Sequence, residues 1–122
     1  MTTLLIIEDN ELNLKLARTI LTGSGYTLLE ATNAEDGLAL ARQHRPPVVL
    51  MDIHLPGMDG MAALQILRSD PVTSHAKVLA ITASAMRGDR ERILAAGFDG
   101  YVSKPFRVQE LLDSVTKMLE VK

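Results

Sequence analysis

Apolar and polar positions alternate in blocks along the whole chain. Five short runs rich in apolar residues predict β-strands, which we place at Leu4–Glu8, Thr27–Ala31, Val48–Asp52, Lys77–Ile81 and Gly100–Ser103. The third and fourth runs are almost continuously apolar, which is typical of central strands buried on both faces. Between the runs, apolar residues recur at helical spacing. This strand and helix alternation predicts an α/β fold with a parallel sheet flanked by helices.

Helix boundaries are marked by capping and breaking residues. We expect helices over Glu11–Thr22, from an Asn33 cap to just before Pro46, over Gly60–Arg68, over Arg87–Ala96 and from Val108 to Leu119. Asparagine is a favoured N-terminal cap, and glycine commonly follows a helix end. The fourth helix is accordingly expected to stop at Gly97. The apolar stripe of the last helix is interpreted as core packing.

Length and composition further limit the possible classes of protein. The chain has 122 residues, 47% of them hydrophobic and 23% charged, which fits one globular domain over residues 1–122. It contains no cysteine and no apolar run near the roughly 20 residues of a spanning helix, so we expect a cytoplasmic protein without membrane contact. A formal charge of -2 argues against direct DNA binding, which is built on basic surfaces.

Charged residues stand where the predicted strands end. Glu8 and Asp9 follow LLII, Asp52 follows VVLM, and Lys104 follows YVS. Because parallel strands end at one edge of a sheet, these residues are expected to share a site. Each close pair of carboxylates there would cost on the order of 4 kcal/mol in repulsion, at ~4 Å and an effective dielectric near 20. A divalent cation bound among them would relieve this repulsion.

Four segments in order, IIEDN, VLMDIHLPGMDG, LAITASA and YVSKPF, together resemble the receiver domain of two-component response regulators. The resemblance covers essentially the whole chain. It implies a flavodoxin-like, doubly wound (βα)5 fold with five parallel strands in the order 2-1-3-4-5. The segments EDNELN and MRGDRERI are most similar to single-domain receivers of the DivK type, and receivers attached to hybrid sensor kinases are close.

The resemblance also implies roles for the acidic residues. Asp52 matches the phosphoryl acceptor, whose carboxylate forms an acyl phosphate. Asp9, Asp52 and the backbone carbonyl of His54 match the ligands of Mg²⁺, with Glu8 acting through a metal-bound water. Taken singly, Asp52 is better explained as a turn cap, and it is Glu8, Asp9 and Lys104 at the other strand ends that favour the acceptor role. The histidines have no spacing typical of metal ligands, so each is interpreted as a surface residue.

Three further residues match positions at which the family senses the phosphoryl group. Thr82 resembles the switch hydroxyl, Lys104 the lysine that pairs with the phosphoryl group, and Tyr101 the aromatic switch residue. The family holds the bond between Lys104 and Pro105 in the cis form. The simpler alternatives are a turn residue at Thr82, a surface cation at Lys104 and a partly buried edge-strand tyrosine at Tyr101.

These roles imply a signalling switch rather than an enzyme, with only self-phosphorylation and self-dephosphorylation chemistry. We expect the phosphoryl donor to be a sensor histidine kinase or a histidine phosphotransfer protein. The downstream protein target would bind the face formed by the fourth helix, fifth strand and fifth helix, where the arginines Arg87, Arg90, Arg92 and Arg107 could meet an acidic partner or remain solvated.

Two other functions remain open at this point. One is a docking module that works without phosphorylation; such proteins typically lose one of the acidic, threonine or lysine positions, and this chain retains all of them. The other is an aspartyl-phosphate-type phosphatase. Its usual nucleophile motif has two aspartates two residues apart, whereas Asp52 is followed two residues later by His54.

Overall fold

Strands and helices alternate strictly in a computed structural model of the protein, which describes residues 2–83 and 87–120. The strands are β1 (Thr3–Ile7), β2 (Thr27–Ala31), β3 (Val48–Asp52), β4 (Lys77–Thr82) and β5 (Gly100–Ser103). The helices are α1 (Glu11–Gly23), α2 (Ala34–His44), α3 (Gly60–Ser69), α4 (Arg87–Ala95) and α5 (Val108–Glu120). Among these helices, none combines the length and apolarity that crossing a bilayer would require.

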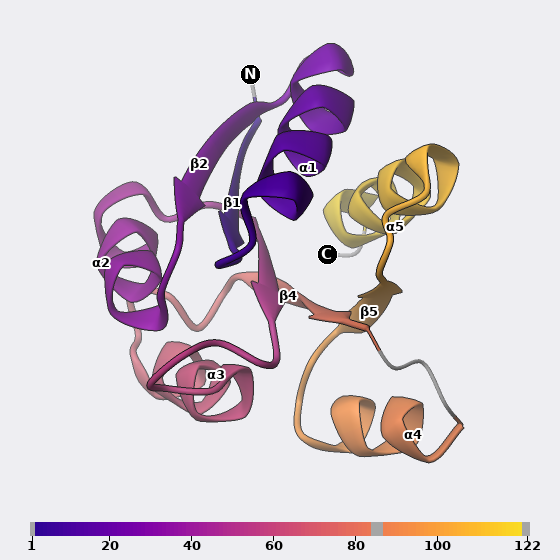
Figure 1. Ribbon diagram of the computed structural model, residues 1–122. Coiled ribbons are helices and arrows are strands. Elements are labelled where there is room, and N and C mark those ends of the chain that lie inside the picture. The colour runs from indigo at the N-terminus through magenta and orange to yellow at the C-terminus, as the bar shows by residue number, and fades with distance from the viewer. Residues whose placement is uncertain (1, 84–86, 121–122) are drawn as a thin grey trace.

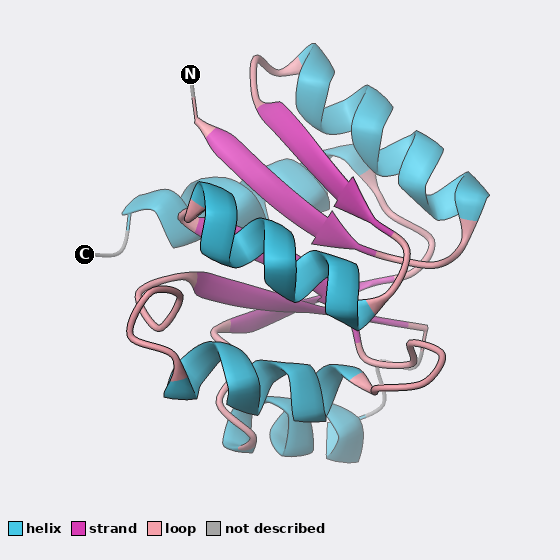
Figure 2. Ribbon diagram, turned by 90° about the vertical axis from the view of Figure 1, so that its left-hand side faces the viewer, coloured by secondary structure: helices cyan, strands magenta, loops and turns pink. Residues whose placement is uncertain are grey.

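All five strands form one parallel sheet in the order β2-β1-β3-β4-β5, which confirms the predicted fold (Figure 2). The register aligns their carboxyl ends. Ile7 of β1 pairs with Met51, so that the residues after β1 lie beside the end of β3. Asp52 pairs with Ile81, and Thr82 pairs with Ser103 at the end of β5. Polar residues at these positions therefore lie along one edge of the sheet.

Helices cover both faces of the sheet (Figure 1). On one face, α1 and α5 pack through a cluster that includes Leu14, Leu21, Leu111 and Val115. On the other face, the helices α2, α3 and α4 contribute Ala41, Leu64, Leu67 and Ile93, among others, to a second cluster. The central strands β1, β3 and β4 supply fully buried residues to both clusters. This arrangement explains why their sequences are almost continuously apolar.

The element boundaries differ from the predicted ones by one residue at several ends. The strand expected at Leu4–Glu8 begins and ends one residue earlier, although the Glu8 N–H still donates to the carbonyl of Ala31 at 2.9 Å. Asn33 caps α2 as predicted, its side chain accepting a hydrogen bond from Asp36 N at 2.8 Å. Gly97, with a φ of 113°, follows the end of α4 in the left-handed conformation that glycine adopts readily.

Candidate phosphoryl-acceptor site

Glu8 and Asp9 leave the end of β1 in different environments. The Glu8 side chain is fully buried, whereas Asp9 is exposed. Directly after them, Asn10 caps α1 and accepts a hydrogen bond from Asn13 N at 3.1 Å, which fixes where the helix begins. The sequence thus places one buried and one exposed carboxylate at the start of a helix.

Asp52 is the last residue of β3 and is almost completely buried. Its Oδ1 accepts a hydrogen bond from the backbone N–H of His54 at 2.8 Å. The loop after it is held tightly: Ile53 N donates to Ile81 O at 3.1 Å, and Gly60 N donates to Ile53 O at 2.8 Å. At Gly60, a Cβ atom would lie 2.7 Å from Asp52 O, so only glycine fits without moving the backbone of the site.

Lys104 joins the two buried carboxylates. Its Nζ lies 2.7 Å from Asp52 Oδ2 and 2.8 Å from Glu8 Oε1. The residue follows β5, its backbone N–H donates to Thr82 O at 2.9 Å, and the bond to Pro105 is cis as expected. Thr82, at the end of β4, is also buried. The structure therefore brings Lys104 into direct contact with Asp52, which excludes the alternative of a solvated surface cation.

Burial and pairing set the protonation of these groups. Burial, together with the neighbouring Asp52, raises the pKa of Glu8 from 4.5 to about 7. Burial also acts to raise the pKa of Asp52, but hydrogen bonds with Glu8, Lys104 and His54 N outweigh it and hold that pKa below 3.8. Burial opposes the charge of Lys104, yet its two carboxylate partners raise its pKa above 10.5. Asp52 is thus the carboxylate that stays ionised, as a nucleophile requires.

The carboxylates also fit a divalent cation. Glu8, Asp9 and Asp52 each offer an oxygen, and these oxygens lie within 4.8 Å of one another. Within the described part of the chain, the buried Oε2 of Glu8 has no hydrogen-bond partner. Oxygen ligands of this kind are those that Mg²⁺ prefers, and Mg²⁺ needs few of them because it keeps several waters. The contribution of the His54 carbonyl stays a prediction; the His54 side chain is exposed, as are those of His44 and His75.

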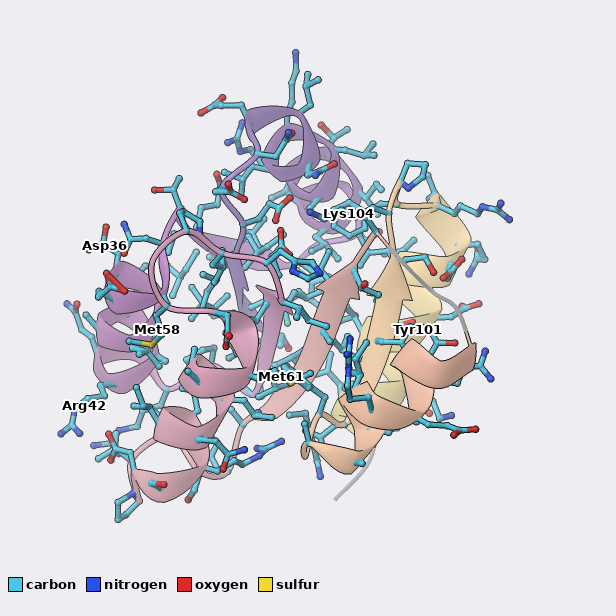
Figure 3. All side chains as sticks on the ribbon, turned by 60° about the horizontal axis from the view of Figure 1, so that its bottom comes forward. Asp36, Arg42, Met58, Met61, Tyr101 and Lys104 are labelled. Carbon is cyan, nitrogen blue, oxygen red and sulfur yellow. The ribbon has the colours of Figure 1, made fainter. Side chains whose placement is uncertain are left out.

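Tyr101 lies in the middle of β5, paired with Ala80 and half-buried. The guanidinium of Arg90 lies over its ring, 5.2 Å from the centroid, and Arg90 Nε donates to its hydroxyl. Figure 3 shows Tyr101 beside α4. Arg90 is therefore held by Tyr101 although it is exposed. Arg92 and Arg107 are exposed too, and the side chain of Arg87 lies outside the described residues.

One side chain at the site was not singled out by the sequence. Asn13 Nδ2 donates to Glu8 Oε1 at 2.6 Å from the first turn of α1. The signal was present in the motif EDNELN, because a polar residue in the first turn of a helix can reach back to the residues that precede the helix. In the sequence, Asn13 contributes only to the resemblance carried by this motif.

Comparison with known proteins agrees with this geometry. A sequence model of the response regulator receiver domain matches residues 4–116. The polar-differentiation response regulator DivK of Brucella anthropi is 42% identical over 117 residues, covering 96% of this chain and 95% of DivK, and DivK of Brucella ovis is 40% identical with the same coverage.

Solved structures give the same result. The receiver domain of the sensor histidine kinase PA1611 from Pseudomonas aeruginosa, described with a magnesium ion coordinated in its active site cleft, superposes with a TM-score of 0.90 at 30% identity over 98% of both chains. A CheY-like receiver domain protein from Methanospirillum hungatei superposes with a TM-score of 0.87 at 28% identity, covering 98% of this chain and 94% of that one. The chain belongs to the response regulator receiver domain family of two-component signalling.

Proposed function

We propose that this chain is a phosphorylation-dependent signalling switch that accepts a phosphoryl group on Asp52. One observation carries the proposal: a buried aspartate at the end of a central strand, with a depressed pKa, is paired with Lys104 beside two further carboxylates. The donor is a phosphohistidine on a sensor histidine kinase or a histidine phosphotransfer protein, since receiver domains interact with proteins of these classes.

In the proposed transfer, a carboxylate oxygen of Asp52 forms a bond to phosphorus while the bond between phosphorus and the imidazole nitrogen of the donor breaks. The imidazole leaves with the electron pair of that bond, and Asp52 carries an acyl phosphate. Lys104 is already 2.7 Å from Asp52 Oδ2, so its charge faces the incoming phosphoryl oxygens. Charge-assisted hydrogen bonds of this kind favour the negatively charged transition state.

The acidic residues would hold the metal. Asp9, Asp52 and the His54 carbonyl would bind Mg²⁺ directly and Glu8 through a water, and bound Mg²⁺ supplies charge neutralisation around the phosphoryl group. This assignment is supported by the separation of the three carboxylates and by the unpartnered Oε2 of Glu8 among the described residues. The protein's own part is to hold these oxygens at the sheet edge.

The signal would then pass to the surface. Thr82 and Lys104 close onto the phosphoryl oxygens, and Tyr101 and the loop after β4 change position. A ligand shifts such a two-state element only by its different interaction with the two states. The downstream target would bind the face of α4, β5 and α5, where Arg90, Arg92 and Arg107 provide positive charge.

The test is phosphorylation by a small donor. Incubation with acetyl phosphate and Mg²⁺ should add one labile phosphoryl group per chain, measured by intact mass. Asp52→Asn should add none, and excess chelator should prevent the reaction in the wild-type protein. Modification of Asp52→Asn to the wild-type extent would refute the assignment of the acceptor. An intact protein that binds Mg²⁺ but is never modified would instead favour a docking module that works without phosphorylation.

A further inference from the structure

Glu8 is held by a neutral side chain as well as by a cation. Asn13 Nδ2 donates to Glu8 Oε1 at 2.6 Å, and Lys104 Nζ lies 2.8 Å from the same oxygen. Glu8 is fully buried, and its second oxygen, Oε2, has no hydrogen-bond partner among the described residues. A buried carboxylate oxygen without a partner is costly, and such groups usually indicate a bound ion or water. Asn13 and Lys104 therefore both bind Oε1, and Oε2 is left available.

We propose that Asn13 is a positioning residue of the divalent-cation site, whose amide holds Glu8 Oε1 and so keeps Oε2 available to the cation. This inference rests on the proposed function, because it takes the three carboxylates as the metal site. Residues that orient metal ligands through hydrogen bonds commonly govern metal affinity although they do not touch the metal. None of the roles inferred above for the other site residues requires this amide.

The position of Asn13 suits this task because its backbone is fixed separately. Its N–H donates to Asn10 Oδ1 at 3.1 Å as part of the cap of α1. The side-chain amide is therefore presented to Glu8 from a defined first helical turn. An amide also leaves the charge of Glu8 intact, whereas a second cation there would compete with the metal for the same carboxylate.

Phosphorylation of Asp52 would also affect Lys104 and Asn13, the two side chains that bind Glu8 Oε1, differently. Lys104 bridges Glu8 and Asp52, and a phosphoryl dianion on Asp52 would attract its ammonium group more strongly than Glu8 does. Asn13 has no charge and is anchored in α1, so its bond to Glu8 does not depend on where Lys104 goes. Asn13 would keep Glu8 oriented in both states of the switch.

The experiment is a Mg²⁺ titration of the unphosphorylated protein, followed by NMR, for wild type, Asn13→Ala, Glu8→Gln and the double variant. We expect Asn13→Ala to raise the Kd for Mg²⁺ roughly tenfold, as for other residues that orient a metal ligand. In the Glu8→Gln background, the same substitution should change the Kd by less than about twofold, because interacting residues are not additive. Asn13→Ser, whose hydroxyl is too short to reach Glu8, provides the same test should Asn13→Ala not fold.

Asn33→Ala is the matched control, because Asn33 caps α2 in the same way and its side chain hydrogen-bonds to Asp36 rather than to a carboxylate of the site. It should lower the melting temperature but leave the Kd for Mg²⁺ unchanged. An unchanged Kd in Asn13→Ala, or an equal loss with and without Glu8, would overturn the proposal. Failure of the wild-type protein to accept phosphate on Asp52, with the Asn13 effect present, would refute the proposed function and leave Asn13 as a positioning residue of a cation site.

Discussion

Arg90 of α4 lies against Tyr101 of β5, with its guanidinium carbon 5.2 Å from the ring centroid and its Nε donating to the phenolic hydroxyl. The contact joins a helix to the edge strand that leads directly to Lys104. It occupies both the face and the hydroxyl of the ring, so Tyr101 cannot change position without breaking it. In the proposed switch, this pair stabilises the resting position of Tyr101.

Arg90→Ala should therefore shift Tyr101, before any phosphate is added, towards the position that Tyr101 takes when Asp52 is phosphorylated. A cation–π contact at an exposed site contributes about 0.5–1 kcal/mol, which corresponds to roughly a twofold to fivefold change in the equilibrium. The measurement is the NMR chemical shift of the Tyr101 ring in unphosphorylated Arg90→Ala, compared with wild type before and after treatment with acetyl phosphate.

Tyr26, the other tyrosine, is an internal control, because it packs against the cluster formed by α1 and α5. Its ring signals should not move in Arg90→Ala. Tyr101 signals identical to those of resting wild type would mean that the pair does not bias the switch.

A second prediction concerns pH and Glu8. Burial and the nearby Asp52 raise the pKa of Glu8 from 4.5 to about 7, so the folded protein binds a proton that the unfolded chain has lost between these values. The free energy of unfolding should therefore fall as pH rises from 4.5 to 7 in metal-free protein. A tenfold change in proton affinity is worth about 1.4 kcal/mol, which makes the total effect about 3 kcal/mol.

Urea unfolding in a chelator at a series of pH values measures this slope. Asp52 and Lys104 contribute little to this slope, because the pKa of Asp52 is depressed below 3.8 and that of Lys104 is raised above 10.5. Glu8→Gln is the control and should be less sensitive to pH in this window. Saturating Mg²⁺ should also reduce the slope, because the cation favours ionised Glu8. Equal pH dependence in wild type and Glu8→Gln would contradict the prediction.

Much of the fold could be predicted because the signals are local. Continuous apolar runs such as Val48–Asp52 mark buried strands, and Asn33 marks a helix start within its own turn. The gathering of Glu8, Asp52 and Lys104 followed from one further step, since parallel strands must end at the same edge. The ends of the strands could be predicted only to within one residue. Glu8, for example, keeps one strand-like hydrogen bond after β1 ends.

Contacts between side chains of different elements could not be predicted in the same way. Nothing in the sequence says that Arg90 meets Tyr101, because their approach depends on how α4 rests on β5. Asn13 is nearer to its partner in sequence, yet its bond to Glu8 depends on the rotamers of both side chains. Sequence patterns identify which residues share a region, and packing decides which of them touch.

Arg68 also makes contacts between different elements, at the end of the sheet opposite to the site. Its Nη1 donates to Ala76 O at 2.6 Å, while Nη2 donates to Gly97 O at 3.0 Å and lies 2.7 Å from Asp99 Oδ2. The same Asp99 oxygen accepts from Val78 N at 2.7 Å. One side chain therefore ties α3 to the start of β4 and to the turn after α4.

Arg68→Ala should lower the free energy of unfolding by about 1–3 kcal/mol, because it removes the donor to the part-buried Ala76 carbonyl and the cationic partner of Asp99, which keeps its bond from Val78 N. Arg18→Ala is the matched control. Arg18 makes a two-bond pair with Glu30, but its side chain is 49% exposed, so its loss should cost clearly less than the loss of Arg68. Urea unfolding at neutral pH compares the two. Equal losses would show that Arg68 acts only as a surface ion pair.

Thr82 and Lys104 are connected through the backbone as well as through the proposed site. Thr82 pairs with Ser103 at the ends of β4 and β5, and its carbonyl oxygen accepts from Lys104 N at 2.9 Å. A movement of Thr82 towards a phosphoryl group on Asp52 would therefore also displace the segment that carries Lys104. In the proposed mechanism, the hydroxyl is needed for this movement, whereas phosphoryl transfer itself rests on Asp52, the metal and Lys104.

Thr82→Ala should accordingly accept phosphate on Asp52 but fail to change its affinity for the partner kinase or target. Losing one charge-assisted hydrogen bond removes roughly 1.5–3 kcal/mol of the bias between the two states, which is most of what a modest switch provides. The measurement is partner binding before and after treatment with acetyl phosphate, with phosphorylation confirmed by intact mass. Thr82→Ser keeps the hydroxyl and should retain the change in affinity. If Thr82→Ala shows the full wild-type change, the signal reaches the surface by another route, and the roles proposed for Thr82 and Tyr101 are wrong.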